Sequence, residues 1–355
     1  MEVTAEKEPL TICSVSYKSR LILQVNYKLV HRLNNPACLD KWVVIDNTPQ
    51  GKEEPFESQY TSFQVLPGPP FPKEQKGHAS YHHAAGLNEA LKAVRTRFVL
   101  IQDPDFFITR MRWIEEIVGH MKERCLAFFG APWHPRWYRK WRYFPCAHCL
   151  FIDLERVERE RLDFTPDIAH QSWPHLSLFI AEHEWMCARG QRFEAWRRIL
   201  RHPRITLAED GRDRTIIGSS RDTGISIYEA YCHAPGIRYE VFQPVYRPDE
   251  DRLVPLPGVR LDGKSALRSL LERIRPDWLS FVPKRRGYFT KTGFAGFGLP
   301  DLRARGWEEF VWKKRPLGFH VRSSLQDKKP SSPAEIQAIL ETLVSHEKAQ
   351  AEETK

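Results

Sequence analysis

The chain has 355 residues, is 41% hydrophobic and contains 11 tryptophans, which is enough to build one large α/β unit or two ordinary domains. No run approaches the roughly 18 consecutive apolar residues of a membrane-spanning helix, and the N-terminal residues lack the basic and apolar regions of a signal peptide. The formal net charge of +9 favours an anionic partner: nucleic acid, a phosphorylated sugar or an acidic membrane surface. Because neither a spanning run nor signal-peptide features are found, we expect a cytoplasmic protein.

Short apolar runs predict the strands. The runs in chain order are residues 11–16, 42–45, 98–101, 126–129 and 148–152, with a weaker run at 63–66 inside a segment rich in Pro, Gly and Glu. Each is the length of an ordinary strand, and the first three are rich in Val and Ile.

Helical periodicity fills the intervals between these runs. Apolar residues recur at helical spacing after Ser19, which is placed as an N-cap, and again over 84–94. Further helices are expected over 111–123, around 179–198 and from Ser331 onward, and turns with short elements over 222–322. Strands that alternate with helices of this length predict the α/β class: a mostly parallel, mixed and twisted sheet with helices on both faces, followed by a C-terminal extension.

Seven cysteines, an odd number spread widely, argue against a disulfide framework and suit a reducing compartment. Cys146 and Cys149 have metal-like spacing, but no second CxxC pair accompanies them and a zinc site needs about four ligands. The sequence favours two thiols on or beside a buried strand.

Acidic residues follow two of the predicted strands. Asp46 ends the run at 42–45, and Asp103 and Asp105 follow the run at 98–101. Ligands of open α/β sheets bind beyond the carboxyl ends of the strands, and two carboxylates separated by one residue suit Mn²⁺ or Mg²⁺. Asp-Pro-Asp is also ordinary turn chemistry, but the strand before it and Asp46 upstream favour a metal site.

The order SVSY, VVIDN and TRFVLIQDPDFF resembles the nucleotide-diphospho-sugar transferases of the GT-A fold, in particular the bacterial family 2-like group of inverting glycosyltransferases. The resemblance covers residues 10–130 and extends to about 322. It implies that Ser16, Tyr17 and Asp46 contact the base and ribose of a nucleotide-sugar donor. It also implies that Asp103 and Asp105 hold the metal that binds the donor diphosphate.

Two further site positions take roles from this resemblance. In the helix before the aspartate pair the family's usual pattern is altered to HHAAGLN, so that Asn88 or one of the histidines is expected to face the donor. His320 is similar to a histidine that completes the metal site, although a packed or surface histidine is the alternative.

Inversion at the anomeric carbon requires a general base near the acceptor hydroxyl. Two carboxylates compete for that role: Asp222, which precedes a Gly-containing turn, and Glu184, in the helix expected around 179–198. The turn favours Asp222, because a loop carboxylate can face a cleft.

The run 136–143 alternates basic and aromatic residues. Such a run suits the interface of an anionic bilayer, single-stranded nucleic acid, a flap over an anionic sugar acceptor, or a loop packed by its own aromatic rings. We expect peripheral contact with the inner face of a membrane and do not expect nucleic acid as a partner.

The sequence therefore predicts a metal-dependent, inverting hexosyltransferase that uses a nucleoside diphosphate sugar and a glycan or glycolipid acceptor, in surface polysaccharide synthesis. Residues 1–215 would form the donor-binding core, 216–325 the acceptor side and 326–355 a helical or flexible tail. A nucleotidyltransferase is the first alternative, but it usually carries a Gly-rich loop after the first strand, and residues 16–19 contain no glycine. A non-catalytic nucleic-acid or membrane-binding protein is the second, and the aspartate pair argues against it.

Overall fold

The structure is a computed structural model that describes residues 8–52, 62–70, 79–135, 143–167, 222–247, 288–321 and 331–353. The helix expected around 179–198 and the domain boundary expected near 215 lie outside these residues.

A seven-stranded sheet forms the centre of the molecule, in the order β3-β2-β1-β4-β7-β6-β8. Its strands are β1 (Leu10–Ser16), β2 (Leu39–Asp46), β3 (Phe63–Pro67), β4 (Phe98–Gln102), β6 (Phe128–Gly130), β7 (Cys149–Asp153) and β8 (Tyr239–Val241). The first four are parallel, β7 runs antiparallel to both β4 and β6, and β8 is parallel to β6. This arrangement confirms the predicted α/β class and its mostly parallel, mixed sheet.

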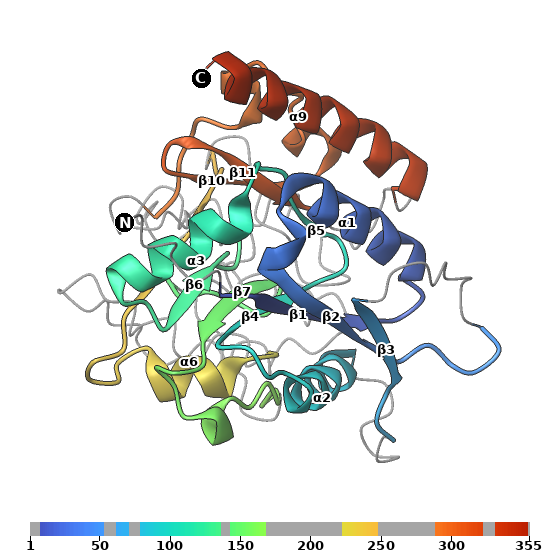
Figure 1. The fold of residues 1–355 in the computed structure, drawn as a ribbon, viewed down its shortest axis with the longest axis vertical. Coiled ribbons are helices and arrows are strands. Elements are labelled where there is room, and N and C mark those ends of the chain that lie inside the picture. The colour runs from blue at the N-terminus through green and yellow to red at the C-terminus, as the bar shows by residue number, and fades with distance from the viewer. Residues whose placement is uncertain are drawn as a thin grey trace, which may run out of the picture.

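Helices cover both faces of this sheet (Figure 1), because its central strands carry apolar side chains on both sides. On one face, α1 (Arg20–Leu33) and α3 (Trp113–Arg124) share a core cluster with Ile12 and Trp42. On the other, α2 (Ala79–Lys92) and α6 (Ile225–Tyr231) share a core cluster with Val15 and Ile45. The first helix begins at Arg20 as expected, but Ser19 makes no side-chain capping bond; instead its hydroxyl donates to Ser16 Oγ at 3.2 Å.

A second, antiparallel sheet has the strand order β5-β11-β10-β9 and was not predicted. Its strands are β5 (Phe106–Ile108), β11 (Arg315–His320), β10 (Glu308–Trp312) and β9 (Gln243–Pro244). These strands are short and come from distant parts of the chain, so no local sequence pattern predicts them. Because β5 follows Asp105 directly and Phe106 pairs with His320, this sheet brings the C-terminal segment to the end of β4.

The C-terminal helix α9 (Pro333–Glu353) starts where the sequence predicted and packs on α1. Ile336, Leu340 and Leu343 are buried in the same core cluster as α1, and Arg32 pairs with Glu341 at 2.6 Å. Among the described residues no helix combines the length and apolarity needed to cross a bilayer.

Candidate functional site

The turn that carries the two aspartates is fixed by neighbours on three sides. The backbone N–H of Asp103 donates to the carbonyl of His148 at the start of β7, at 3.0 Å. The side-chain amide of Asn26, buried in α1, donates to the carbonyl of Phe106 at 2.7 Å. The N–H of Val321 donates to the carbonyl of Asp105 at 3.0 Å. A turn held in this way can present both carboxylates in one orientation.

His320 lies beside these carboxylates. Its Nε2 is 3.1 Å from Asp105 Oδ1 and 3.8 Å from Asp103 Oδ2. Each of the three residues offers one ligand atom, and these atoms lie within 4.8 Å of one another. The imidazole is buried, whereas the Asp103 side chain is 22% exposed, so a cation could enter from the open side. Two carboxylates and one imidazole form a donor set that fits Mn²⁺, and the oxygens suit Mg²⁺.

His83 of α2 is a fourth group at this cluster. Its Nε2 is 3.2 Å from Asp103 Oδ1. Burial alone would raise the pKa of Asp103, but the hydrogen bond to His83 and the charges of His83, His320 and His148 lower it below its ordinary value. Burial would likewise lower the pKa of His83, and its contact with Asp103 together with nearby carboxylates raises it. The Asp103 carboxylate is thus ionised at neutral pH, the state that binds a cation.

A groove of about 590 Å³ opens at the carboxyl ends of β2 and β3. Its lining includes Arg20, Asp46 and His82. The carboxylate of Asp46 accepts from Arg20 Nε at 2.5 Å and from the backbone N–H of Thr48 at 2.9 Å. These two bonds hold the side chain of Asp46 in one position at the rim.

The two other residues implied for the base and ribose differ in exposure. Ser16 pairs with Asp46 across the β1–β2 register and is fully buried, whereas the Tyr17 side chain is 61% exposed. Ser16 therefore supports the turn after β1, and Tyr17 is the member of the pair that is accessible to a ligand.

Asn88 is turned away from the acidic cluster. Its amide nitrogen donates to Asp163 Oδ1 at 2.9 Å, and its Oδ1 accepts from the N–H of Phe164 at 3.0 Å. Asn88 thus ties α2 to residues 163–165, and on this helix His83 is the side chain that contacts the aspartates.

Asp222 is buried at the start of α6, with 7% of its surface exposed. Its Oδ1 accepts from the N–H of Thr223 at 2.8 Å, and its charge is one of those that raise the pKa of His83. Thr223 Oγ1 also donates to the carbonyl of Ser80 in α2 at 3.2 Å, so Asp222 lies beside the helix that carries His83. The competing candidate, Glu184, lies outside the described residues.

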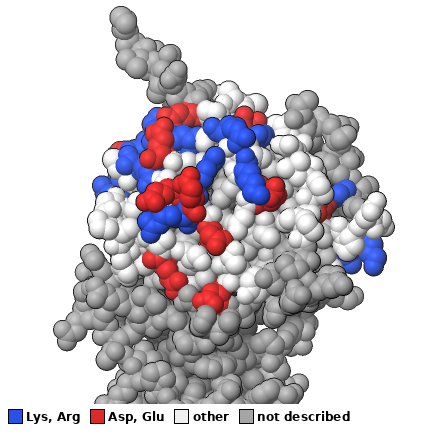
Figure 2. Space-filling model, turned by 90° about the horizontal axis from the view of Figure 1, so that it is seen from below, with Lys and Arg blue, Asp and Glu red and all other residues white. Residues whose placement is uncertain are grey.

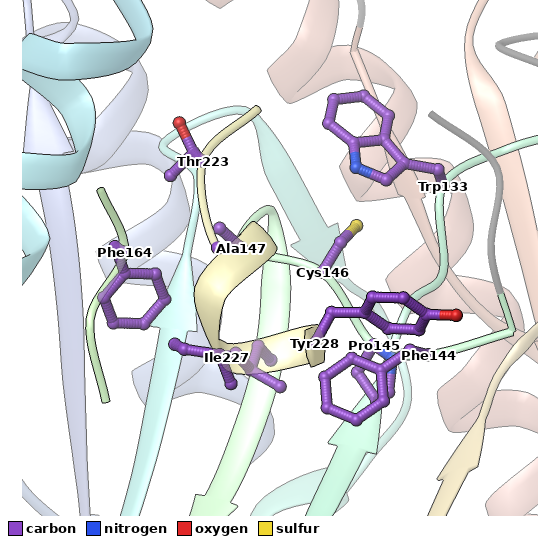
Figure 3. Close-up of a pocket in the computed structure, with 11 residues that line it drawn as sticks. Trp133, Phe144, Pro145, Cys146, Ala147, Phe164, Thr223, Ile227 and Tyr228 are labelled. Atoms are coloured by element: carbon purple, nitrogen blue, oxygen red, sulfur yellow. The ribbon is translucent and has the colours of Figure 1, made fainter. Parts of the chain in front are cut away.

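A small apolar cavity lies between α6 and the loops that flank β7 (Figure 3). Trp133, Cys146 and Tyr228 face it, and Thr223 lies at its other end. Cys146 Sγ is 2.7 Å from His148 Nδ1. Cys149 is buried at the start of β7, and burial raises the pKa of its thiol well above the ordinary value. Both thiols thus lie on or beside a buried strand, as expected.

The fold and the site together define an α/β protein with a candidate divalent-cation site and a groove beyond the carboxyl ends of its strands. No protein-family model matches the chain, and no curated protein matches it either.

Solved structures with similar architecture include those of two proteins. One is the mannosyltransferase PcManGT from Pyrobaculum calidifontis, in complex with GDP-Man and Mn²⁺. Its TM-score is 0.32 and its sequence identity 15%, and the match covers 44% of this chain and 47% of PcManGT. The other is residues 1–349 of TarS from S. aureus, which has also been solved with UDP-GlcNAc. Its TM-score is 0.31 and its sequence identity 13%, and the match covers 44% of this chain and 50% of the TarS chain. The chain spans about half the length of these proteins.

Proposed function

We propose that the protein is a metal-dependent glycosyltransferase that moves a sugar, with inversion, from a nucleoside diphosphate sugar to a glycan or glycolipid acceptor. The observation that carries this proposal is the cluster of Asp103, Asp105 and His320, placed by two sheets at the end of β4. A groove with a fixed carboxylate, Asp46, opens at the ends of the neighbouring strands. A nucleotide in that groove would have its diphosphate directed toward the cluster.

Asp103, Asp105 and His320 would hold the cation. A bound Mn²⁺ or Mg²⁺ would offset the negative charge that develops on the departing nucleoside diphosphate. The backbone of the turn that carries both aspartates is held by hydrogen bonds with Asn26, His148 and Val321, which would keep the two carboxylates in place for the cation. Such preorganisation avoids the cost of ordering the ligands during the reaction.

The donor nucleotide would be bound by residues at the ends of β1 and β2. In this proposal the exposed ring of Tyr17 packs against the base, and Asp46 accepts a hydrogen bond from the ribose. Arg20, already paired with Asp46, keeps that carboxylate oriented and adds positive charge beside the nucleotide. His83 is close enough to Asp103 to donate to a diphosphate oxygen bound there.

Asp222 is the proposed general base, which removes the proton from the acceptor hydroxyl as that hydroxyl attacks the anomeric carbon. Its place at the start of α6, on the same side of the sheet as His83, supports this role. The proton would pass to the carboxylate, and the nucleoside diphosphate would leave on the side of the aspartate pair.

Binding of nucleoside diphosphates should depend on the metal, and a thermal-shift measurement tests this directly. A ligand that binds only the native state stabilises it by RT ln(1 + [L]/Kd), or about 2.7 kcal/mol at 100-fold excess over Kd. We expect UDP or GDP to raise the Tm clearly with Mn²⁺ and little with EDTA. Equal shifts with and without the metal would contradict the assigned role of the cluster.

Membrane attachment is proposed from the net charge of +9 and the basic-aromatic run at 136–143. Acidic and basic side chains interleave on the described surface seen in Figure 2, so that face offers no reason to bind an anionic bilayer. Residues 136–142 lie outside the described residues. Each Lys or Arg near an anionic leaflet contributes about 1 kcal/mol, so the run would give reversible attachment.

Liposome co-sedimentation should therefore show binding to anionic but not to neutral vesicles. We expect binding to be lost at high salt, because the Debye length falls from about 10 Å at 0.1 M to about 3 Å at 1 M. Replacing Arg139, Lys140 and Arg142 together by Ala should reduce it. No binding to anionic vesicles at low salt would contradict the membrane role and leave the run as an acceptor contact.

A further inference from the structure

Glu308 is a charged residue at the start of β10 that is completely buried. Its Oε2 lies 3.3 Å from Nδ1 of His320, its direct partner across the β10–β11 register. The other ring nitrogen of His320, Nε2, faces Asp105 at 3.1 Å. The imidazole therefore lies between a buried carboxylate on one side and the candidate metal ligands on the other.

Ring packing fixes the plane of the His320 imidazole but does not decide which of its two nitrogens carries the proton. The ring stacks on His148 at a centroid distance of 4.9 Å and 25° between planes, and it contacts Phe106 at 5.7 Å. A neutral imidazole carries one proton, on either nitrogen, and only the bare nitrogen can ligate a metal. The group that faces Nδ1 decides which nitrogen is bare.

The neighbouring residue, Glu309, shows what a purely structural buried glutamate does in this strand. It points to the opposite face of β10, and its carboxylate accepts from the backbone N–H groups of Phe294 at 2.7 Å and Leu302 at 2.8 Å. Glu309 thus secures a loop. The contact of Glu308, in contrast, is with the ring of the candidate metal ligand.

We propose that Glu308 is a positioning residue for the metal site, which it serves through the charge of its carboxylate, 3.3 Å from Nδ1 of His320. This contact favours the proton on Nδ1, leaves Nε2 free to ligate, and increases the electron density that Nε2 can donate. Carboxylates that act through a ligating histidine in this way typically change metal affinity by about 10- to 100-fold. The proposal rests on the metal site of the proposed function, and it adds a residue that does not touch the cation.

Mn²⁺ affinity of the purified full chain, measured from the electron paramagnetic resonance signal of free Mn²⁺, tests the proposal without reference to turnover. We expect Glu308→Ala to weaken binding toward 100-fold and Glu308→Gln by about tenfold. The amide keeps the shape of the side chain, but it lacks the charge and can present an N–H to Nδ1, which favours the wrong tautomer. Glu309→Gln, the matched control, should lower the Tm and leave Mn²⁺ affinity at the wild-type value.

Nitrogen NMR of histidine-labelled protein saturated with diamagnetic Mg²⁺ supplies a second readout. The His320 ring signals, identified by their loss in His320→Ala, should indicate the Nδ1–H tautomer in the wild type and change in Glu308→Gln. If Glu308→Ala does not fold, the isosteric variant Glu308→Gln still tests the proposal.

The outcomes separate the two proposals. If wild-type protein fails to bind Mn²⁺, or Asp103→Asn binds it normally, both the metal site and the role of Glu308 are wrong. If Asp103→Asn loses Mn²⁺ while Glu308→Gln retains wild-type affinity and wild-type His320 signals, only the positioning role is wrong.

Discussion

Asp103→Asn and Asp105→Ala should each reduce metal-dependent nucleotide-sugar turnover by at least about 10²–10³-fold, the usual effect of removing one charge-stabilising group from an active site. Asp103 has the larger expected effect because it also pairs with His83, at 3.2 Å. Its pKa is lowered by the surrounding histidines against the effect of burial, so the wild-type side chain is charged at neutral pH, and asparagine cannot replace that charge. Release of nucleoside diphosphate over a Mn²⁺ series measures the loss.

The matched control is Asp40→Asn, an exposed aspartate of β2 that is far along the strand from Asp46. It should retain wild-type turnover. Both site variants should remain folded, since the turn is held by backbone bonds and by Asn26 rather than by the carboxylates. Full activity in both site variants would show that the aspartates form only a turn.

The apolar runs of the central sheet made most of the fold predictable. Strands β1 and β4 are buried along their whole length, so they appear in the sequence as continuous hydrophobic runs. The order of these runs was then enough to place the acidic residue that ends β2 and the two that follow β4 at one edge of the sheet. The position of His320 came only from a family resemblance, because its strand pairs with a three-residue strand, β5, which is too short to show a pattern.

The polar residues around the aspartates were harder to predict, because their roles depend on contacts between distant segments. The helical pattern of α2 offered both Asn88 and a histidine, and the structure shows that Asn88 bonds to residues 163–165 while His83 reaches Asp103. Glu308 gave no signal, because a glutamate pair at the start of a strand normally indicates an exposed end. Only the pairing of β10 with β11 explains how it can be buried beside His320.

Asp222→Asn should reduce turnover by about 10²–10⁴-fold, the range expected for loss of general base catalysis, with little change in donor affinity. Asparagine has nearly the same shape, and its side-chain oxygen can still accept from the N–H of Thr223 as Asp222 does at 2.8 Å. The variant therefore keeps the turn before α6 and removes only the ability to take a proton. Steady-state kinetics measures the loss of kcat, and calorimetry with a nucleoside diphosphate and Mn²⁺ measures the Kd that should stay constant.

Asp163→Asn controls for the loss of a carboxylate near α6, because Asp163 is exposed and contacts Asn88 and Thr165 rather than the aspartate cluster. It should retain turnover within a small factor.

Glu184→Gln distinguishes the two candidate bases. If that variant loses turnover with unchanged donor affinity while Asp222→Asn stays active, the proton is taken by Glu184. Asp222 would then have a structural role, in which its carboxylate caps the turn that leads into α6 and its charge faces His83.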